Sequence, residues 1–435
     1  ILEMNKYINR PVVGIDVAAE FSMVAILAPD GEVYRKSFRI NHTLDGFEYL
    51  ASEIKKVEEK YDMKVASFME STGVYHISLF HFLNDNKFDV FTINPLITNS
   101  NKNFDIRKVK NDKQDALAIA KICKFQNIKV SSNFDKELYT LKSLCREYYK
   151  LTDTKSTFKK KLSNELRVIF PGYLNIFSDT TSKSSLQILK KYPRPIDILS
   201  ADKTEIIDLL LKLSRKGMKY AENKYDLLLA AAKESLITGV PSDSLFVKLK
   251  ANISIIENFE VQMDLLLSEI KNLLSSGKIP SDILKNIELL QSIPGIGEVT
   301  AITILSEIGD FKNFAKSKKL VAFFGLDPSV NESGKFKGSN NHISKRGTRT
   351  GRRALYAVAL ASVRSKRNGL ATNSVLLNYY KENMNGKSKK VGIVAVMKKL
   401  LGYIFSILKN QKSYEIRHPE LHCKMYVENQ YLKVA

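Results

Sequence analysis

The chain has 435 residues, which is long enough for two or three domains with their own cores. Its 68 Lys and Arg exceed its 46 Asp and Glu, giving a net charge of +22 that favours a polyanionic partner, nucleic acid before an anionic membrane. A merely soluble basic protein is the alternative. Three cysteines without CxxC spacing argue against a disulfide framework and fit a reducing cytoplasm. The most apolar stretch, "VGIVAVMKKLLGYIFSIL", contains Lys398 and Lys399, so it predicts an amphipathic helix and no membrane span.

The N-terminal part, residues 4–130, alternates strand and helix patterns. An Asp30-Gly31 turn separates two strand-like runs, and Thr43 is the expected cap of the first helix. The segments that carry these patterns are, in order, "VVGIDVAAEFSMVAIL", "GEVYRKSFRI", "TLDGFEYLASEIKKVEEKY", "VASFMES", "HISLFHFLNDN", "FDVFTIN" and "KNDKQDALAIAKICKF". Strands and helices in this order predict an α/β domain.

The middle part, residues 131–285, loses the strand signal. A long basic helical stretch stops at Pro171-Gly172, short helical patterns follow, and a second long stretch, "SLFVKLKANISIIENFEVQMDLLLSEIKNLLSS", has heptad-like spacing. We expect an all-α region with antiparallel helices or a coiled coil. A plain helical spacer is the alternative.

The last part is also predicted to be mostly helical. It begins at residue 286, contains "IELLQSIPGIGEVTAITILSEIGD" and ends with two apolar helices, around 354–363 and 391–408. Residues 286–412 form the third predicted domain, and 413–435 are expected to be a polar tail.

Four acidic residues of the first domain are candidates for a metal site. Asp16 interrupts an apolar strand, Glu70 ends another, and Asp112 and Asp115 share one face of a helix. Burying four acids without partners is costly, and Mg²⁺ ions, which prefer carboxylate oxygens, would neutralise them and support phosphodiester chemistry. Each acid alone could be a cap, a turn residue or a solvated side chain. Their order resembles the ribonuclease-H-type, RuvC-like fold of Holliday-junction resolvases.

Two glycine-containing segments of the third domain are candidates for nucleic-acid binding. "SIPGIGEVTAITIL" resembles a helix-hairpin-helix turn, in which Gly295 and Gly297 would present backbone N–H groups to a phosphate. A tight turn between core helices is equally compatible. The loop "NESGKFKGSNNHISKRGTRTGRRALY" contains cations that could clamp phosphate, among them Lys335, Lys337, Lys345, Arg346, Arg352 and Arg353. A serine in it could be a nucleophile or only a phosphate-binding hydroxyl.

Together these segments resemble the DEDD transposases of insertion-sequence family 110, which are related to the Piv/MooV DNA invertases. The resemblance rests on "GIDVA", "MESTGVYH", "VKNDKQDALAIA", "SRKGMKYAENKYDLLLAAAKES", "IPGIGEVTAITILSEIGDF" and "FFGLDPSVNESGKFKGSNNHISKRGTRTGRRALY". It implies that Asp16, Glu70, Asp112 and Asp115 are the catalytic, metal-binding tetrad. The nucleophilic serine of the family matches Ser333, in a Ser-Gly motif. Ser344 is the second choice.

The same resemblance implies the activity and the partners. We expect an Mg²⁺-dependent recombinase of a prokaryotic cytoplasm or nucleoid, guided by a noncoding bridge RNA that pairs with donor and target DNA. Homodimers would assemble into a synaptic tetramer with composite active sites, away from any membrane. Two alternatives stay open: a RuvC-like metal-dependent nuclease or junction resolvase with water as nucleophile, and a non-catalytic nucleic-acid-binding protein.

Overall fold

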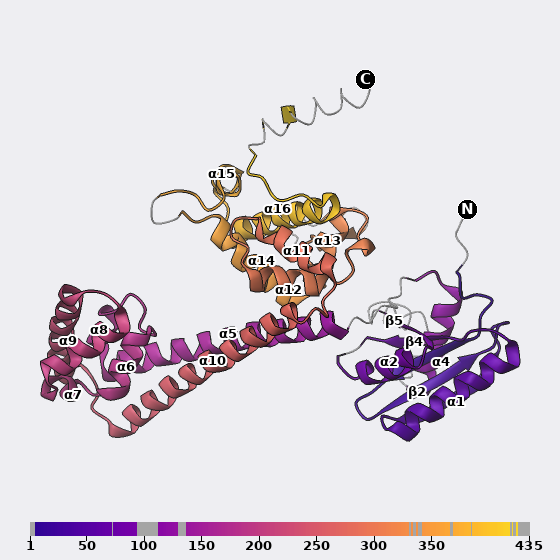
Figure 1. Ribbon diagram of the computed structural model, residues 1–435, viewed down its shortest axis with the longest axis horizontal. Helices are drawn as coiled ribbons and strands as arrows, with labels where there is room; N and C mark the ends of the chain where they lie inside the picture. The colour runs from indigo at the N-terminus through magenta and orange to yellow at the C-terminus, as the bar shows by residue number, and fades with distance from the viewer. Residues whose placement is uncertain are drawn as a thin grey trace. The chain divides into compact units, whose positions relative to one another are not determined.

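The structure is a computed structural model of the chain. It describes residues 5–71, 73–93, 112–128, 136–329, 332–333, 336–337, 342–365, 369–383, 385–417, 420 and 423–424. The chain divides into two compact units, the N-terminal unit Ile1–Asp135 and the C-terminal unit Lys136–Ala435 (Figure 1). The predicted domain limits at 130/131, 285/286 and 412/413 stay predictions.

The N-terminal unit has the strands and helices that the sequence predicts, in the predicted order. They are β1 (Val12–Val17), β2 (Phe21–Leu27), β3 (Val33–Asn41), α1 (Leu44–Tyr61), β4 (Ala66–Glu70), α2 (His76–Asp85), β5 (Asp89–Ile93) and α4 (Asp112–Phe125). The expected cap is confirmed, because the Thr43 hydroxyl oxygen accepts a hydrogen bond from the N–H of Gly46 at 3.2 Å. Gly31, with φ of +94°, turns the chain between β2 and β3, as the Asp30-Gly31 pair predicts.

These strands form one mixed sheet in the order β3-β2-β1-β4-β5. β2 pairs antiparallel with β1 and β3, whereas β4 pairs parallel with β1 and β5. Both faces are covered, since Val13 and Ile15 of β1 pack in a cluster with α1 and α2, while Val12 packs with α4 on the other face. The predicted α/β class of this part is confirmed.

A glycine allows α4 to lie directly on the central strand. A Cβ atom at position 14 would lie 2.2 Å from the carbonyl oxygen of Ala116 and 2.5 Å from the amide nitrogen of Ala120. Neither backbone atom can move without moving the helix, so Gly14 sets the distance between β1 and α4.

The described part of the C-terminal unit is mostly helical, as predicted. Its elements are α5 (Lys136–Ile169), η1 (Pro171–Asn175), α6 (Lys183–Lys191), α7 (Pro195–Ser200), α8 (Lys203–Ser214), α9 (Met218–Thr238), α10 (Asp243–Ser275), α11 (Ser281–Gln291), α12 (Glu298–Ile308), η2 (Phe311–Asn313), α13 (Ser317–Phe323), β6 (Glu332–Ser333), β7 (Phe336–Lys337), α14 (Arg349–Ser362), α15 (Ser374–Asn383) and α16 (Lys389–Asn410).

The two long helices α5 and α10 pack side by side in opposite directions (Figure 1). Lys155 of α5 bonds to Glu260 of α10 at 2.6 Å, and further along α5 the buried Glu165 accepts two hydrogen bonds from Asn252, at 2.6 and 2.7 Å. Because a later residue of α5 meets an earlier residue of α10, the pair is antiparallel, and this buried polar pair fixes its register. One end of α5 packs in a core with α6–α10, and the other in a core with α11–α16.

An ion pair anchors α5 to α12. The Glu307 carboxylate is almost fully buried and accepts hydrogen bonds from two nitrogens of Arg146, at 2.7 and 3.0 Å, while Lys142 lies 3.6 Å away. Burial alone raises the pKa of Glu307. The hydrogen bond from Arg146 and the charges of Lys142 and Arg146 outweigh burial and hold that pKa below its ordinary value.

The apolar C-terminal stretch forms α16, which packs in the protein core. Among the described residues it is the one helix long and apolar enough to cross a membrane, but half of its apolar window is buried in the protein. Its buried side chains, such as Ile393, Leu400 and Ile404, belong to the core with α11–α15. This is the burial that a core helix shows.

The Arg146–Glu307 pair gives a stability prediction. Arg146→Met leaves the buried carboxylate with Lys142 as its one charged partner, and we expect it to lower the free energy of unfolding by about 3 kcal/mol. The double variant Arg146→Met/Glu307→Leu removes the buried charge as well and should recover most of that loss. Urea denaturation of both variants measures the difference. A double variant less stable than Arg146→Met would contradict this.

The depressed pKa of Glu307 also predicts a pH dependence. Its charge stabilises the fold above the pKa of the unfolded carboxyl, about 4.3, and that contribution is lost as the pH falls through the lower folded-state value. The stability difference between wild type and Glu307→Gln should therefore be largest at neutral pH and shrink below about pH 4.3. A difference that stays constant in acid denaturation series would exclude this role.

The contact at Gly14 predicts that added volume disturbs α4. Gly14→Ala should destabilise the N-terminal unit by about 1–3 kcal/mol through overpacking, and it should speed hydrogen exchange in 112–125. Gly402→Ala is the control, because no atom lies within 4 Å of a Cβ there and the residue is helical. The control should be stabilising by about 1 kcal/mol. If the two variants have equal effects on stability and hydrogen exchange, the contact between position 14 and α4 does not restrict side-chain volume there.

Candidate active site

Two of the predicted catalytic acids lie at the carboxyl ends of neighbouring strands. Ile15 of β1 pairs with Met69 of β4 in parallel register, so Asp16 and Glu70 follow as the next residues of the two strands. Asp16 shares a face of the sheet with Gly14, and the alternation of β4 places Glu70 on the same face, which α4 covers. Both residues are half-buried.

The packing of α4 gives its direction along the sheet. Near its start, Ala116 packs with Met23 and Ala25 of β2, which pair with Asp16 and Gly14 of β1. Near its end, Cys123 packs with Val12, the first residue of β1. The helix therefore runs opposite to β1, and its first turn lies at the edge where β1 and β4 end.

This direction brings the start of α4, with Asp112 and Asp115, to the edge that carries Asp16 and Glu70. Asp115 is half-buried, and the side chain of Asp112 lies outside the described residues. Among the described side chains, no three His, Cys, Asp or Glu lie close enough together to hold a metal ion. Carboxylate oxygens are the donors that Mg²⁺ prefers, and the backbone directs these acids to one edge. The complete tetrad stays a prediction.

The far end of α4 is held by polar contacts that the sequence did not reveal. The Asn5 amide donates to three carbonyl oxygens at the end of the helix, at 2.7 to 3.0 Å. The buried Lys124 ammonium donates to the carbonyl oxygens of Ile8 and Arg10, at 2.8 and 2.7 Å. Burial lowers the pKa of Lys124, and the charge of Asp30 partly opposes this.

The loop between α13 and α14 of the C-terminal unit, called the serine loop because it contains Ser333, includes a two-stranded ribbon. Pro328 pairs antiparallel with Ile343, and further along Ser333 on β6 pairs with Phe336 on β7. The side chain of Ser333 lies outside the described residues, so its role as nucleophile stays a prediction.

The second-choice serine lies where this ribbon begins and has a carboxylate partner. The Ser344 hydroxyl donates to Asp327 Oδ1 at 2.5 Å, and its backbone N–H donates to the Asp327 carbonyl oxygen at 2.8 Å. The same hydroxyl accepts a hydrogen bond from the N–H of Arg346 at 3.3 Å. Ser344 thus clamps the two sides of the loop together. Sequence reasoning missed Asp327, because seventeen positions separate the partners and no periodicity links them.

Two of the predicted phosphate-binding arginines make internal contacts. Arg352 donates to the carbonyl oxygens of Phe324 and Gly347, at 3.1 and 3.0 Å. Arg353 pairs with Asp153 of α5 at 3.0 Å. Each guanidinium has five N–H donors, so these contacts leave donors for a phosphate while fixing where each group lies.

The other predicted cations of the loop include two that are exposed. Lys345 and Arg346 are exposed and make no ion pair within the described ranges. Lys335 and the side chain of Lys337 lie outside the described residues. Lys345 and Arg346, together with the exposed Arg349 at the start of α14, are therefore the described cations of this segment most open to a phosphate.

The predicted helix-hairpin-helix turn joins α11 to α12. Ile293 and Ile296 are buried, whereas Gly295 and Gly297 are exposed. Gly295, with φ of +102°, lies against α14, where a Cβ atom would be 3.1 Å from the Ser362 hydroxyl oxygen. The turn thus packs its apolar side chains inward and presents glycine backbone outward, which suits both a core turn and a phosphate contact. The binding role stays a prediction.

Comparison with known protein families matches two separate parts of the chain. Residues 13–171 match a transposase family named for the DEDD acids and IS110, and residues 287–374 match the transposase IS116/IS110/IS902 family. The first segment contains Asp16, Glu70, Asp112 and Asp115, and the second contains Ser333. Together the two segments cover more than half of the chain.

Similar individual proteins come from several bacteria. An insertion element IS110 uncharacterized 43.6 kDa protein of Streptomyces coelicolor is 22% identical over 232 residues, which are 53% of each chain. The transposase for insertion sequence element IS1111A of Coxiella burnetii is 32% identical over 130 residues, 30% of this chain and 35% of that protein. The pilin gene-inverting protein of Moraxella bovis is 29% identical over 130 residues, 30% of this chain and 38% of that protein.

The matched segments thus span about half or less of the length of these curated relatives. The family assignment comes from the agreement of two family models, one over the strand edge with the acidic residues and one over the serine loop. The chain belongs to the IS110 family of DEDD transposases.

Proposed function

We propose that this chain is the RNA-guided recombinase of an insertion sequence, which cleaves and rejoins DNA through a serine and an Mg²⁺-binding acidic tetrad. The observation that carries the proposal is the edge where Asp16, Glu70 and the start of α4 meet. A pure nucleic-acid-binding protein has no need to gather acidic residues, which would repel its ligand.

The sheet supports a RuvC-like, ribonuclease-H-type domain. The order β3-β2-β1-β4-β5, with β4 and β5 parallel to β1 and β2 antiparallel to it, is the order of that fold. Asp16 lies near the carboxyl end of β1, the first strand. The same edge would hold the metal through Asp16, Glu70, Asp112 and Asp115.

The proposed reaction forms and breaks one phosphoester bond in each step. The Ser333 oxygen attacks a DNA phosphorus, the Ser–O–P bond forms, and the bond to one deoxyribose oxygen breaks as that oxygen takes up the serine proton. The hydroxyl of a new DNA partner then attacks the phosphoserine, restores a phosphodiester and returns a proton to Ser333. When bound, Mg²⁺ would activate the attacking oxygen and stabilise charge on the leaving oxygen. The phosphodiester energy is conserved, as rejoining requires.

The proposed partners are polyanions. Donor and target DNA and a noncoding bridge RNA suit the net charge of +22, and homodimers would join into a tetramer in which one subunit's acidic edge meets another's serine loop. The proposed phosphate contacts are Gly295, Gly297, Lys335, Lys337, Lys345, Arg346, Arg352 and Arg353. The name of the Moraxella relative, a pilin gene-inverting protein, supports DNA rearrangement.

The identity of the nucleophile can be tested with serine variants of one loop. Ser333→Ala should abolish strand exchange and the denaturation-resistant protein–DNA adduct, while binding of DNA and RNA is retained. Ser344→Ala should weaken the reaction but keep the adduct, because it loosens the clamp with Asp327 and leaves the attacking oxygen in place. Ser339→Ala is the control within the same loop. Denaturing gels with labelled DNA give the readout.

The opposite outcomes would change the mechanism. An adduct that survives Ser333→Ala but is lost in Ser344→Ala would make Ser344 the nucleophile, with Asp327 as its proton acceptor. Wild-type cleavage that needs Mg²⁺ but never gives an adduct would favour the nuclease with water as nucleophile.

The metal site can be tested with isosteric variants. Asp16→Asn and Asp115→Asn should lower Mg²⁺-dependent cleavage by at least about 100-fold, since metal positioning and transition-state charge both depend on them. Asp45 lies in the first turn of α1, on the face of the sheet opposite to α4, so Asp45→Asn should leave the rate unchanged. Mg²⁺ titration followed by calorimetry should show weaker binding in the first two variants only. Wild-type affinity and rate in Asp16→Asn would refute the site.

A further inference from the structure

The turn between α8 and α9 carries a cluster of exposed cations. Lys212, Arg215, Lys216 and Lys219 are exposed and lie within eight residues, and Lys224 lies half-buried further along α9. We call these five residues the α8–α9 basic patch. It lies in the helical region between α5 and α10, outside the candidate active site and outside the two matched family segments.

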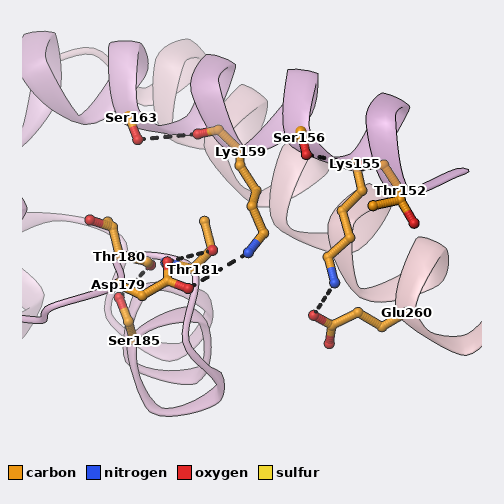
Figure 2. A network of polar contacts seen from close by, with 10 residues as sticks. All are labelled: Thr152, Lys155, Ser156, Lys159, Ser163, Asp179, Thr180, Thr181, Ser185 and Glu260. Atoms are coloured by element: carbon orange, nitrogen blue, oxygen red, sulfur yellow. Dashed lines mark hydrogen bonds and ion pairs between the residues drawn. The ribbon is translucent and has the colours of Figure 1, made fainter. Parts of the chain in front are cut away.

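Several cations elsewhere on this helical region are paired. Figure 2 shows Lys155 of α5 reaching Glu260 at 2.6 Å, and Lys159 reaching Asp179 at 3.7 Å. In the same region, α6 carries two more paired lysines, Lys190 with Glu257 and Lys191 with Glu205. The charge of these four lysines is therefore compensated within the protein.

The patch differs from these neighbours. None of its five cations forms an ion pair within the described part of the chain. The acids nearest in sequence, Asp208, Glu222 and Asp226, are exposed and make no ion pair with them. Five cations against these three acids leave the patch with a net positive charge.

An aromatic ring holds two of the cations near each other. Lys216 Nζ lies 4.3 Å from the ring centroid of Tyr220, and Lys224 Nζ lies 5.6 Å from the same centroid. Lys224 also lies 5.6 Å from the ring of Phe177 and donates to the carbonyl oxygen of Ile176. These contacts restrict both ammonium groups to one side of the turn.

Holding like charges together without an acid costs free energy. Burial, helped by the charge of Lys216, lowers the pKa of Lys224. The turn itself is fixed, since Arg215 adopts a left-handed conformation with φ of +54° and ends α8 with a hydrogen bond to Leu211. α9 begins directly after it at the exposed Gly217, so the positive end of a 21-residue helix adds to the same field.

We propose that the α8–α9 basic patch binds the phosphodiester backbone of a nucleic acid. The inference deepens the proposed function, on which it rests, by assigning a nucleic-acid contact to the helical region. A chain of phosphates suits it better than a single anion, because the cations extend over the end of one helix and the start of the next. Ammonium groups that are held in place by an aromatic ring suit a polymer with regularly spaced charges. A protein that binds a fluid membrane surface usually inserts several apolar side chains as well.

The test compares two charge-matched triple variants of the full-length protein. Lys212→Gln/Lys216→Gln/Lys219→Gln removes three patch cations. Lys233→Gln/Lys250→Gln/Lys271→Gln removes three exposed lysines elsewhere, on α9 and α10. Lys233 is about 21 Å along α9 from Lys219. Fluorescence anisotropy with a labelled DNA duplex and a labelled RNA stem-loop, over a series of KCl concentrations, gives the salt slope for each polymer.

The patch variant should flatten the slope by about 2 to 3 for the polymer that occupies the patch, since each duplex phosphate contact contributes about 0.9. Loss in the RNA arm or the DNA arm identifies which backbone binds. The control variant should change the slope by less than about 1. Lys212→Arg/Lys216→Arg/Lys219→Arg keeps the charge and should keep the slope, which separates charge from folding.

Equal slopes for the patch and control variants, with tight binding by wild type, would overturn the patch and leave the proposed function intact. Wild type that binds neither polymer would overturn both. Binding to vesicles of phosphatidylserine and phosphatidylcholine is measured for the same variants. If the patch variant loses only vesicle binding while its nucleic-acid slopes match the control, the patch is a membrane contact and the proposal is wrong.

Discussion

The meeting of the candidate catalytic acids at one edge depends on the contact between β1 and α4. Because position 14 has no side chain, the backbone of α4 lies against the central strand. Asn5 and the buried Lys124 hold the other end of the helix, so its start lies where β1 and β4 end. Two strand ends and one helix start, far apart in sequence, thereby meet at one edge. The chemistry proposed for that edge therefore depends on the short distance between α4 and the sheet.

The sequence predicted those parts of the fold that local chemistry determines. Alternating apolar residues, the Thr43 cap and the Asp30-Gly31 turn each act within a few residues, and the elements that they predict are present. The contacts between helices were not predictable in the same way. Arg146 and Glu307 are 161 residues apart, and both residue types would ordinarily be assigned to a solvated face. Only the folded chain brings them together and buries the carboxylate.

The serine loop shows the same limit at the candidate site. Residue type alone assigned each arginine to phosphate, yet Arg352 bonds to backbone carbonyl oxygens and Arg353 to Asp153. Ser344, chosen as a possible nucleophile, bonds to Asp327 where the loop begins. A sequence shows which groups can bind an anion, but a fold also needs donors to satisfy its own buried carbonyls and carboxylates. Which use prevails depends on tertiary neighbours that have no fixed spacing.

Net charge has the same ambiguity on the scale of the whole chain. Many of its cations are occupied within the protein: Lys124 holds the N-terminal segment, Arg146 anchors α5, and Lys155 joins two long helices. A charge that is compensated at hydrogen-bond distance contributes little field to an approaching polyanion. Other cations form no ion pair within the described residues, among them Lys345 and Arg346 of the serine loop and those of the α8–α9 basic patch. The location of unpaired charge, more than its sum, therefore determines where a nucleic acid can bind this protein.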